Sequence, residues 1–162
     1  MYPTARHLCA RLGPGEVPTL QLFDSSVLIP WLRTRHYDAL VTTAFASRRF
    51  LLSTVVGMEL YAGTQRRADK QDLDRMVRVL TGIGRVVSPA PEDFYTAGQM
   101  VATYAHRYWQ IALRDHAHDI LIALGTWRAR AELFTVNRQD MERWQGLLRR
   151  AGKRIAVRAV EA

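Results

Sequence analysis

Four short apolar segments are spaced along this chain, and longer stretches with the apolar spacing of helices separate them. These segments are Leu20–Phe23, Phe50–Ser53, Arg85–Ser88 and Leu133–Val136, and an alternating pattern follows at Arg154–Val160. Strands that pair in parallel need a crossover between them, and a helix usually provides it. The alternation therefore predicts an α/β fold with three layers (α/β/α), in which helices flank a central, mainly parallel sheet of about five short strands.

The length of 162 residues fits one domain. Proline and glycine are frequent in residues 1–18, which we interpret as an irregular N-terminal arm, followed by a single domain over 19–162. Cys9 is the only cysteine, so neither an internal disulfide nor a cysteine zinc site is expected. No apolar run is long enough for a membrane span or a secretory signal. We therefore expect a cytoplasmic protein without a membrane partner.

The charge of the chain is strongly positive. There are 23 Lys+Arg against 15 Asp+Glu, a formal net charge of +8, and only Lys70 and Lys153 are lysines. Arginine binds phosphate groups through its planar fork, so this composition favours a nucleic-acid partner. The alternative is that the arginines reflect the base composition of the genome and are partly paired with the acids.

Four acidic residues stand out by their position relative to the predicted strands. Asp24 directly follows the first strand, Glu59 lies in an apolar helix after the second, and Asp140 follows the fourth. Asp119 precedes the apolar part of a helix predicted to begin at Asp115. Ligands of open α/β sheets bind at the carboxyl ends of the strands, where all four carboxylates can meet.

Each of these acids also has an ordinary interpretation. Asp24 and Asp119 can be helix N-caps, and Asp140 can be a surface residue. Glu59 is harder to explain in this way, because burying an unpaired carboxylate is costly. As a set, the acids favour a divalent metal site. Carboxylates that lie close together repel one another, and a bound cation relieves this repulsion. Their hard oxygen atoms are suited to Mg²⁺ or Mn²⁺. Such a site can activate water and orient a phosphodiester, while a basic rim holds the polyanion.

The segments around these acids resemble a known family. Residues 22–29 (LFDSSVLI), 52–63 (LSTVVGMELYAG), 119–123 (DILIA) and 135–141 (TVNRQDM) occur in the order and approximate spacing of the PIN-domain ribonucleases. The likeness is greatest to the VapC-type toxins of bacterial toxin–antitoxin pairs. It extends over most of the chain, although Met141 replaces a common phenylalanine and the N-terminal arm is longer than usual.

This resemblance implies an endoribonuclease that depends on Mg²⁺ or Mn²⁺. Asp24, Asp119 and Asp140 would be metal ligands, and Glu59 would bind the metal or position the attacking water. Neighbouring polar residues would orient the carboxylates: Ser25, Ser53, Thr135 and Asn137. The resemblance further implies an RNA substrate, a homodimer and a cognate antitoxin that blocks the pocket. A PIN-fold RNA-processing nuclease without an antitoxin and an inactive nucleic-acid-binding domain remain as alternatives.

The sequence departs from the family just before Asp119. Asp115, His116 and His118 stand where the family often has Gly, Pro or Asn. We interpret Asp115 as a helix cap rather than an additional ligand. His116 and His118 are expected to be exposed histidines at a helix start, with a proton donor to the leaving group as the alternative.

Overall fold

The computed structural model describes residues 19–161, which form seven helices and one five-stranded sheet. The arm predicted for residues 1–18, together with Cys9, lies outside the described residues. The strand order is β3-β2-β1-β4-β5, and every neighbouring pair is parallel. The strands are β1 Gln21–Phe23, β2 Phe50–Ser53, β3 Val86–Val87, β4 Glu132–Thr135 and β5 Ala156–Ala159. The prediction of a parallel α/β sheet is therefore confirmed.

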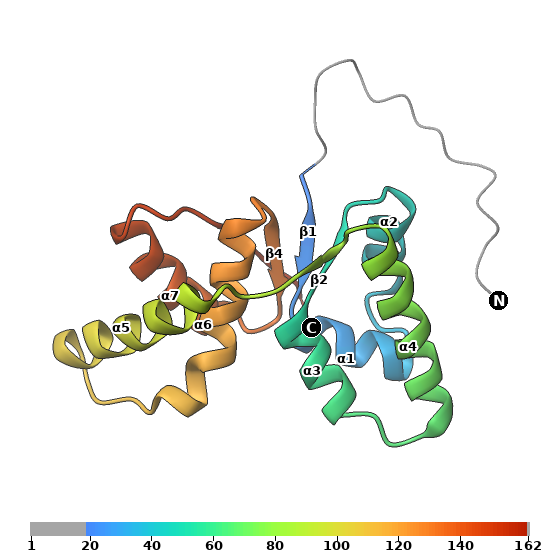
Figure 1. Ribbon diagram of the computed structural model, residues 1–162, viewed down its shortest axis with the longest axis horizontal. Helices are drawn as coiled ribbons and strands as arrows, with labels where there is room; N and C mark the ends of the chain where they lie inside the picture. The colour runs from blue at the N-terminus through green and yellow to red at the C-terminus, as the bar shows by residue number, and fades with distance from the viewer. Residues whose placement is uncertain (1–18, 162) are drawn as a thin grey trace, which may run out of the picture.

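The helices cover the two faces of this sheet in separate groups. Figure 1 shows α1 to α4 on one side of the strands and α5 to α7 on the other. Their bounds are α1 Ser25–Thr34, α2 Asp38–Ala46, α3 Thr54–Ala62, α4 Arg67–Gly82, α5 Pro91–Arg107, α6 Leu113–Arg128 and α7 Arg138–Arg150. The three-layer arrangement is the one that the alternating pattern predicts.

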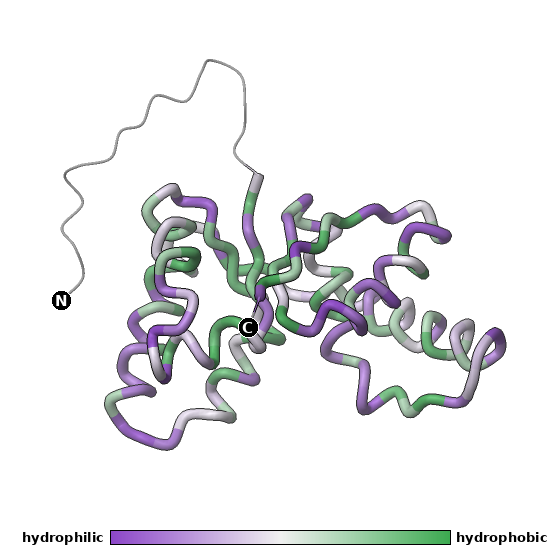
Figure 2. Tube along the Cα trace, turned by 180° about the vertical axis from the view of Figure 1, so that it is seen from behind, coloured by the Kyte–Doolittle hydropathy of each residue, from purple (hydrophilic) through white to green (hydrophobic). Residues whose placement is uncertain are grey.

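The core forms where the strands meet the apolar helix faces. Phe23 stacks between Phe50 and Phe134, with ring centroids 5.2 and 5.0 Å away. Ile120 to Leu124 are nearly or fully buried in α6, the most continuous apolar stretch of any helix. Figure 2 shows apolar segments gathered mostly along the middle of the molecule and hydrophilic ones mostly around its periphery. The sheet thus provides a rigid base for the residues at its carboxyl edge.

Side chains at the strand ends cap the helices that follow β1 and β2. Asp24 is the N-cap of α1, which is the ordinary role that the sequence also allows for it. Ser53 is the N-cap of α3, because its hydroxyl accepts a hydrogen bond from the amide of Val55.

Helix α6 begins at Leu113, two residues before the predicted start at Asp115. Its N-cap is Ala112, which has no capping side chain, so the sequence carries no signal at the true boundary. Asp119 therefore lies in the second turn of α6 and is not a cap. Asp115 is not a cap either, and its carboxylate lies 3.3 Å from Nε of Arg114.

No helix within residues 19–161 is long and apolar enough to cross a membrane.

Candidate metal centre at the carboxyl edge of the sheet

Asp24 is held rigidly at the end of the central strand β1. Its amide donates to the carbonyl of Phe134 at 2.9 Å, which continues the pairing of β1 with β4. Oδ1 accepts from the amide of Ser25, the first residue of α1, at 2.7 Å, which satisfies one of the free amides at the start of the helix. Oδ2 accepts from the hydroxyls of Ser26 at 2.8 Å and Thr135 at 2.9 Å. The side chain is only 4% exposed, so backbone and hydroxyl donors fix the carboxylate almost out of contact with solvent.

Burial dominates the electrostatics of Asp24. Removing the carboxylate from water raises its pKa above the usual 3.8, although the hydrogen bonds from Ser26, Thr135 and Ser25 favour the charged form. The negative charge of Glu59 adds to the increase. A cation placed at this carboxylate would remove the cost of holding it ionised.

The segment after β4 carries the second fixed acid. The side-chain amide of Asn137 donates to Oδ2 of Asp140 at 2.9 Å, and Arg143 lies 3.1 Å from Oδ1. The backbone amide of Asn137 in turn donates to the hydroxyl of Thr135 at 3.0 Å. Since Thr135 also donates to Asp24, a continuous chain of hydrogen bonds connects Asp24 to Asp140 across the strand end.

Glu59 extends from α3 toward α6 and meets a histidine there. Its Oε1 lies 2.6 Å from Nδ1 of His118. Its Oε2 is buried and has no hydrogen-bond partner among residues 19–161. A buried carboxylate oxygen without a donor is costly, so Glu59 has the unfilled capacity of a ligand or a proton acceptor.

Asp119 has the most strongly altered acidity of the four. Its pKa rises from 3.8 to about 7, first because the side chain is largely buried and then because Asp24, Asp140 and Glu59 all repel its charge. His118 acts in the opposite direction. Three acids from three other segments of the chain therefore lie near enough to Asp119 to influence its ionisation, as the sequence predicts for the set.

The carboxylates are close electrostatically but do not surround one point. Within the described residues, no group of three His, Cys, Asp or Glu side chains is arranged to hold an ion. The donor set nevertheless fits a divalent cation, because it consists of hard oxygens, one of them buried and unpartnered. A cation would also offset the repulsion that Asp24, Asp140 and Glu59 exert on the ionised carboxylate of Asp119.

The supporting residues only partly coincide with those expected. Thr135 and Asn137 contact Asp24 and Asp140 as the resemblance implies. Ser25 acts mainly through its amide, since its hydroxyl is 3.4 Å from Asp24. Within residues 19–161, the Ser53 hydroxyl caps α3 and makes no hydrogen bond to any of the four acids.

Two functional contacts were missed from the sequence. The first is Ser26, whose hydroxyl donates to Asp24 and accepts from the amide of Val136 at 3.1 Å. Its position two residues after an aspartate was the available signal. The second is the pairing of His118 with Glu59, which is 59 residues away in sequence. The histidine is exposed as expected, with 47% of its side chain accessible. No local pattern announces that contact.

Comparison with known proteins places this geometry in a structural context. No family model matches the sequence, and no curated protein matches it significantly. Solved structures do match. A chain of the VapBC2 complex from Rickettsia felis bound to a promoter DNA fragment has a TM-score of 0.59 at 14% identity, covering 88% of the present chain and 99% of its own.

Two further complexes give the same result. A chain of DNA-bound VapBC from Salmonella typhimurium has a TM-score of 0.58 at 18% identity, with 88% of the present chain and 98% of that chain covered. A chain of FitAcB from Neisseria gonorrhoeae has a TM-score of 0.58 at 18% identity, with 85% and 96% covered. At such low identity the likeness concerns the fold, and the chain therefore has the PIN-like α/β fold of the matched chains in the VapBC and FitAcB complexes.

Proposed function

We propose that this chain is the toxin of a toxin–antitoxin pair and a divalent-metal-dependent endoribonuclease. The observation that carries the proposal is the burial of Asp119 close to three other carboxylates, which together raise its pKa to about 7. Repulsion between carboxylates has no benefit for folding, but it is typical of acids that share a cation. The VapBC and FitAB complexes of the same fold support the toxin role.

Asp24, Asp119 and Asp140 would hold Mg²⁺ or Mn²⁺ in this proposal. When bound, the ion supplies Lewis acidity, which lowers the pKa of water and offsets phosphodiester charge. The hydroxyls of Ser26 and Thr135 keep Asp24 in place, and the amide of Asn137 does the same for Asp140. Oε2 of Glu59, which has no donor within residues 19–161, is the atom available to accept the proton of an attacking water.

The basic surface agrees with two polyanionic partners. At a net charge of +8, the chain attracts RNA as a substrate. It would equally attract an acidic antitoxin segment that covers the carboxylates. Cleavage of cellular RNA would place the protein in the cytoplasm.

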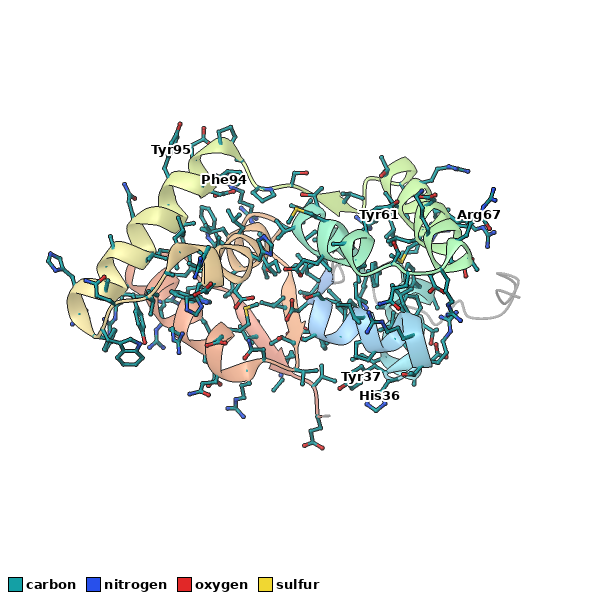
Figure 3. All side chains as sticks on the ribbon, turned by 90° about the horizontal axis from the view of Figure 1, so that it is seen from below. His36, Tyr37, Tyr61, Arg67, Phe94 and Tyr95 are labelled. Atoms are coloured by element: carbon teal, nitrogen blue, oxygen red, sulfur yellow. The ribbon has the colours of Figure 1, made fainter. Side chains whose placement is uncertain are left out.

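A homodimer is the third element of the proposal. Met58 of α3 and Phe94 and Tyr95 of α5 are 51%, 57% and 74% exposed, and Figure 3 shows Tyr95 projecting outward from α5. A second copy would bury these apolar side chains. Light scattering should show the wild type with the mass of a dimer and a Phe94→Ala/Tyr95→Ala variant with the mass of a monomer.

RNA cleavage with and without metal tests the activity directly. We expect a mixed RNA pool to be cleaved by the wild type with Mg²⁺ or Mn²⁺, and not in EDTA. Asp24→Ala and Asp119→Ala should abolish cleavage while far-ultraviolet circular dichroism shows the fold unchanged. Full activity in both variants would disprove the role of the acids. RNA binding without cleavage by the wild type would favour an inactive binding domain.

The gene neighbourhood and co-expression test the antitoxin. A small open reading frame beside this gene, acidic in its C-terminal half, should encode a protein that co-purifies with the chain and suppresses cleavage. If no such neighbour exists and cleavage persists, the chain is an RNA-processing nuclease of the same fold.

A further inference from the structure

A strip of aromatic side chains leads from the acid cluster to the surface of the molecule. It consists of Tyr104 in the last turn of α5 and of Tyr108 and Trp109, which follow the helix directly, and we call these three residues the aromatic strip. The ring centroid of Tyr104 lies 4.8 Å from that of Tyr108 and 5.3 Å from that of Trp109. Tyr104 is 4% exposed, whereas Tyr108 is 50% and Trp109 is 58% exposed. The strip is therefore anchored inside the protein and open at its outer end.

Arg143 connects the inner end of the aromatic strip to the acid cluster. Its guanidinium lies 5.2 Å from the ring centroid of Tyr104 and 5.7 Å from that of Trp144. The same guanidinium is 3.1 Å from Oδ1 of Asp140. One side chain therefore contacts both the candidate metal centre and the first ring of the strip.

Helix α6 provides a second connection between the aromatic strip and the acid cluster, through Trp144 of α7, whose ring centroid lies 5.8 Å from that of Tyr104. The ring of His116 lies 5.3 Å from that of Trp144 and 60° from its plane. His116 and Asp119 are three residues apart in α6, so their side chains leave the helix on neighbouring positions of one face. Figure 1 shows the connection between α5 and α6 at the lower left, on the same lower side of the molecule as α1 and α3.

The charges around the exposed rings favour a nucleic acid over a second protein. Arg107 precedes the rings and is exposed, and Arg114 follows them with 87% of its side chain exposed. Arg107 forms no ion pair with any acid of residues 19–161. A single base needs only one exposed ring face, which Tyr108 and Trp109 can each provide.

We propose that the aromatic strip is the binding surface for unpaired bases of the RNA substrate beside the cleaved bond. Bases would stack on Tyr108 and Trp109 while Arg107 and Arg114 contact phosphates. This inference rests on the proposed ribonuclease function and adds where the substrate lies. It requires single-stranded RNA, because bases in a duplex cannot present their faces to a side chain.

Binding of RNA in EDTA tests the strip without cleavage. The probe is a short fluorescein-labelled single-stranded RNA of mixed sequence, and its anisotropy reports the affinity. We expect Trp109→Ala to weaken binding about tenfold and Trp109→Phe, which keeps a ring, to restore most of it. Ile83→Ala is the control, because Ile83 is also 58% exposed but lies at the end of α4, on the other face of the sheet.

A probe of equal length without bases separates stacking from charge. We expect the wild type and Trp109→Ala to bind this abasic strand equally. Equal losses on both probes would overturn the proposal, because charge or folding would then explain them. Unchanged RNA binding by Trp109→Ala would also overturn it, as would a change in oligomeric mass in place of an RNA effect.

The failure of the strip can be told apart from the failure of the ribonuclease. If Trp109→Ala binds RNA as the wild type does while metal-dependent cleavage is intact, only the strip is disproved. If the wild type neither binds nor cleaves RNA, both proposals are disproved together.

Discussion

His118 and Glu59 join two helices at the candidate metal centre. Nδ1 of His118 on α6 lies 2.6 Å from Oε1 of Glu59 on α3, and the other carboxylate oxygen is buried without a partner in the part of the chain that the structure describes. Because His118 engages Oε1, Oε2 is the oxygen of Glu59 that remains available to a metal ion or a water molecule. His118 itself is 47% exposed, so the histidine supports the carboxylate from the solvent side.

Removing the side chain of His118 should leave the Glu59 carboxylate free to change its orientation. We expect His118→Ala to lower the rate of metal-dependent RNA cleavage by about tenfold or more, because residues that orient ligands typically contribute this much. His118→Asn should recover most of the rate, since the amide nitrogen of Asn occupies nearly the position of Nδ1. His118→Gln places its amide one bond farther away and should not. Equal rates in all four proteins would show that the contact has no role in the reaction.

The raised pKa of Asp119 predicts an unusual dependence of the protein's stability on pH. A carboxyl group whose pKa rises from 3.8 to about 7 on folding binds its proton more tightly in the folded state. Its contribution to stability is therefore greatest below pH 3.8 and is lost as the pH rises to about 7. Asp119→Asn removes this loss. Without metal, we expect its Tm to exceed that of the wild type by an amount that grows from about pH 4 to about pH 7 and is constant above.

Differential scanning fluorimetry across this range, in buffers containing EDTA, provides the measurement. Asp115→Asn is a matched control, because Asp115 is an exposed acid in the same helix. A Tm difference for Asp119→Asn that does not change with pH would contradict the shifted pKa.

Metal binding should stabilise the wild type and leave the stability of the Asp24→Ala variant almost unchanged. A ligand at about one hundred times its Kd stabilises the folded state by about 2.7 kcal/mol, which corresponds to roughly 5–10 °C in Tm for a domain of this size. We expect Mn²⁺ to raise the Tm of the wild type by this amount and that of Asp24→Ala hardly at all. The apparent affinity should decrease below about pH 7, where protons compete for Asp119. An equal Mn²⁺ shift in both proteins would place the ion elsewhere.

The sheet was predictable from sequence because its signal is local. The segments around Phe23, Leu52 and Leu133 are short, apolar and separated by helices, and only a parallel sheet satisfies such an order. The positions of Asp24 and Asp140 followed from the same logic, since both come soon after a strand. Asp119 was selected from its place before the apolar part of a helix, but the start of that helix could not be located, because its N-cap Ala112 has no capping side chain.

The contacts that depend on packing were not predictable. His118 meets Glu59 only because α3 and α6 cross near the sheet edge, and nothing in either segment specifies the partner. Arg143 has the spacing of an ordinary helix-surface pair with Asp140, yet it also lies over Tyr104 from α5. Sequence patterns identify which residues reach the edge of the sheet, and packing decides which of them meet.

The two serines after Asp24 give a closely matched test of the hydrogen-bond network. Ser26 donates its hydroxyl to Oδ2 of Asp24 at 2.8 Å and accepts from the amide of Val136, whereas the Ser25 hydroxyl lies 3.4 Å from Oδ1. We expect Ser26→Ala to lower the free energy of unfolding by about 1–3 kcal/mol, because a nearly buried carboxylate and a backbone amide both lose a partner. Ser25→Ala keeps its amide donor to Asp24 and should change stability by less than about 0.5 kcal/mol. Urea unfolding of both variants in EDTA gives the comparison. A larger loss for Ser25→Ala would show that the Ser25 hydroxyl, and not the Ser26 hydroxyl between β1 and β4, holds Asp24 in place.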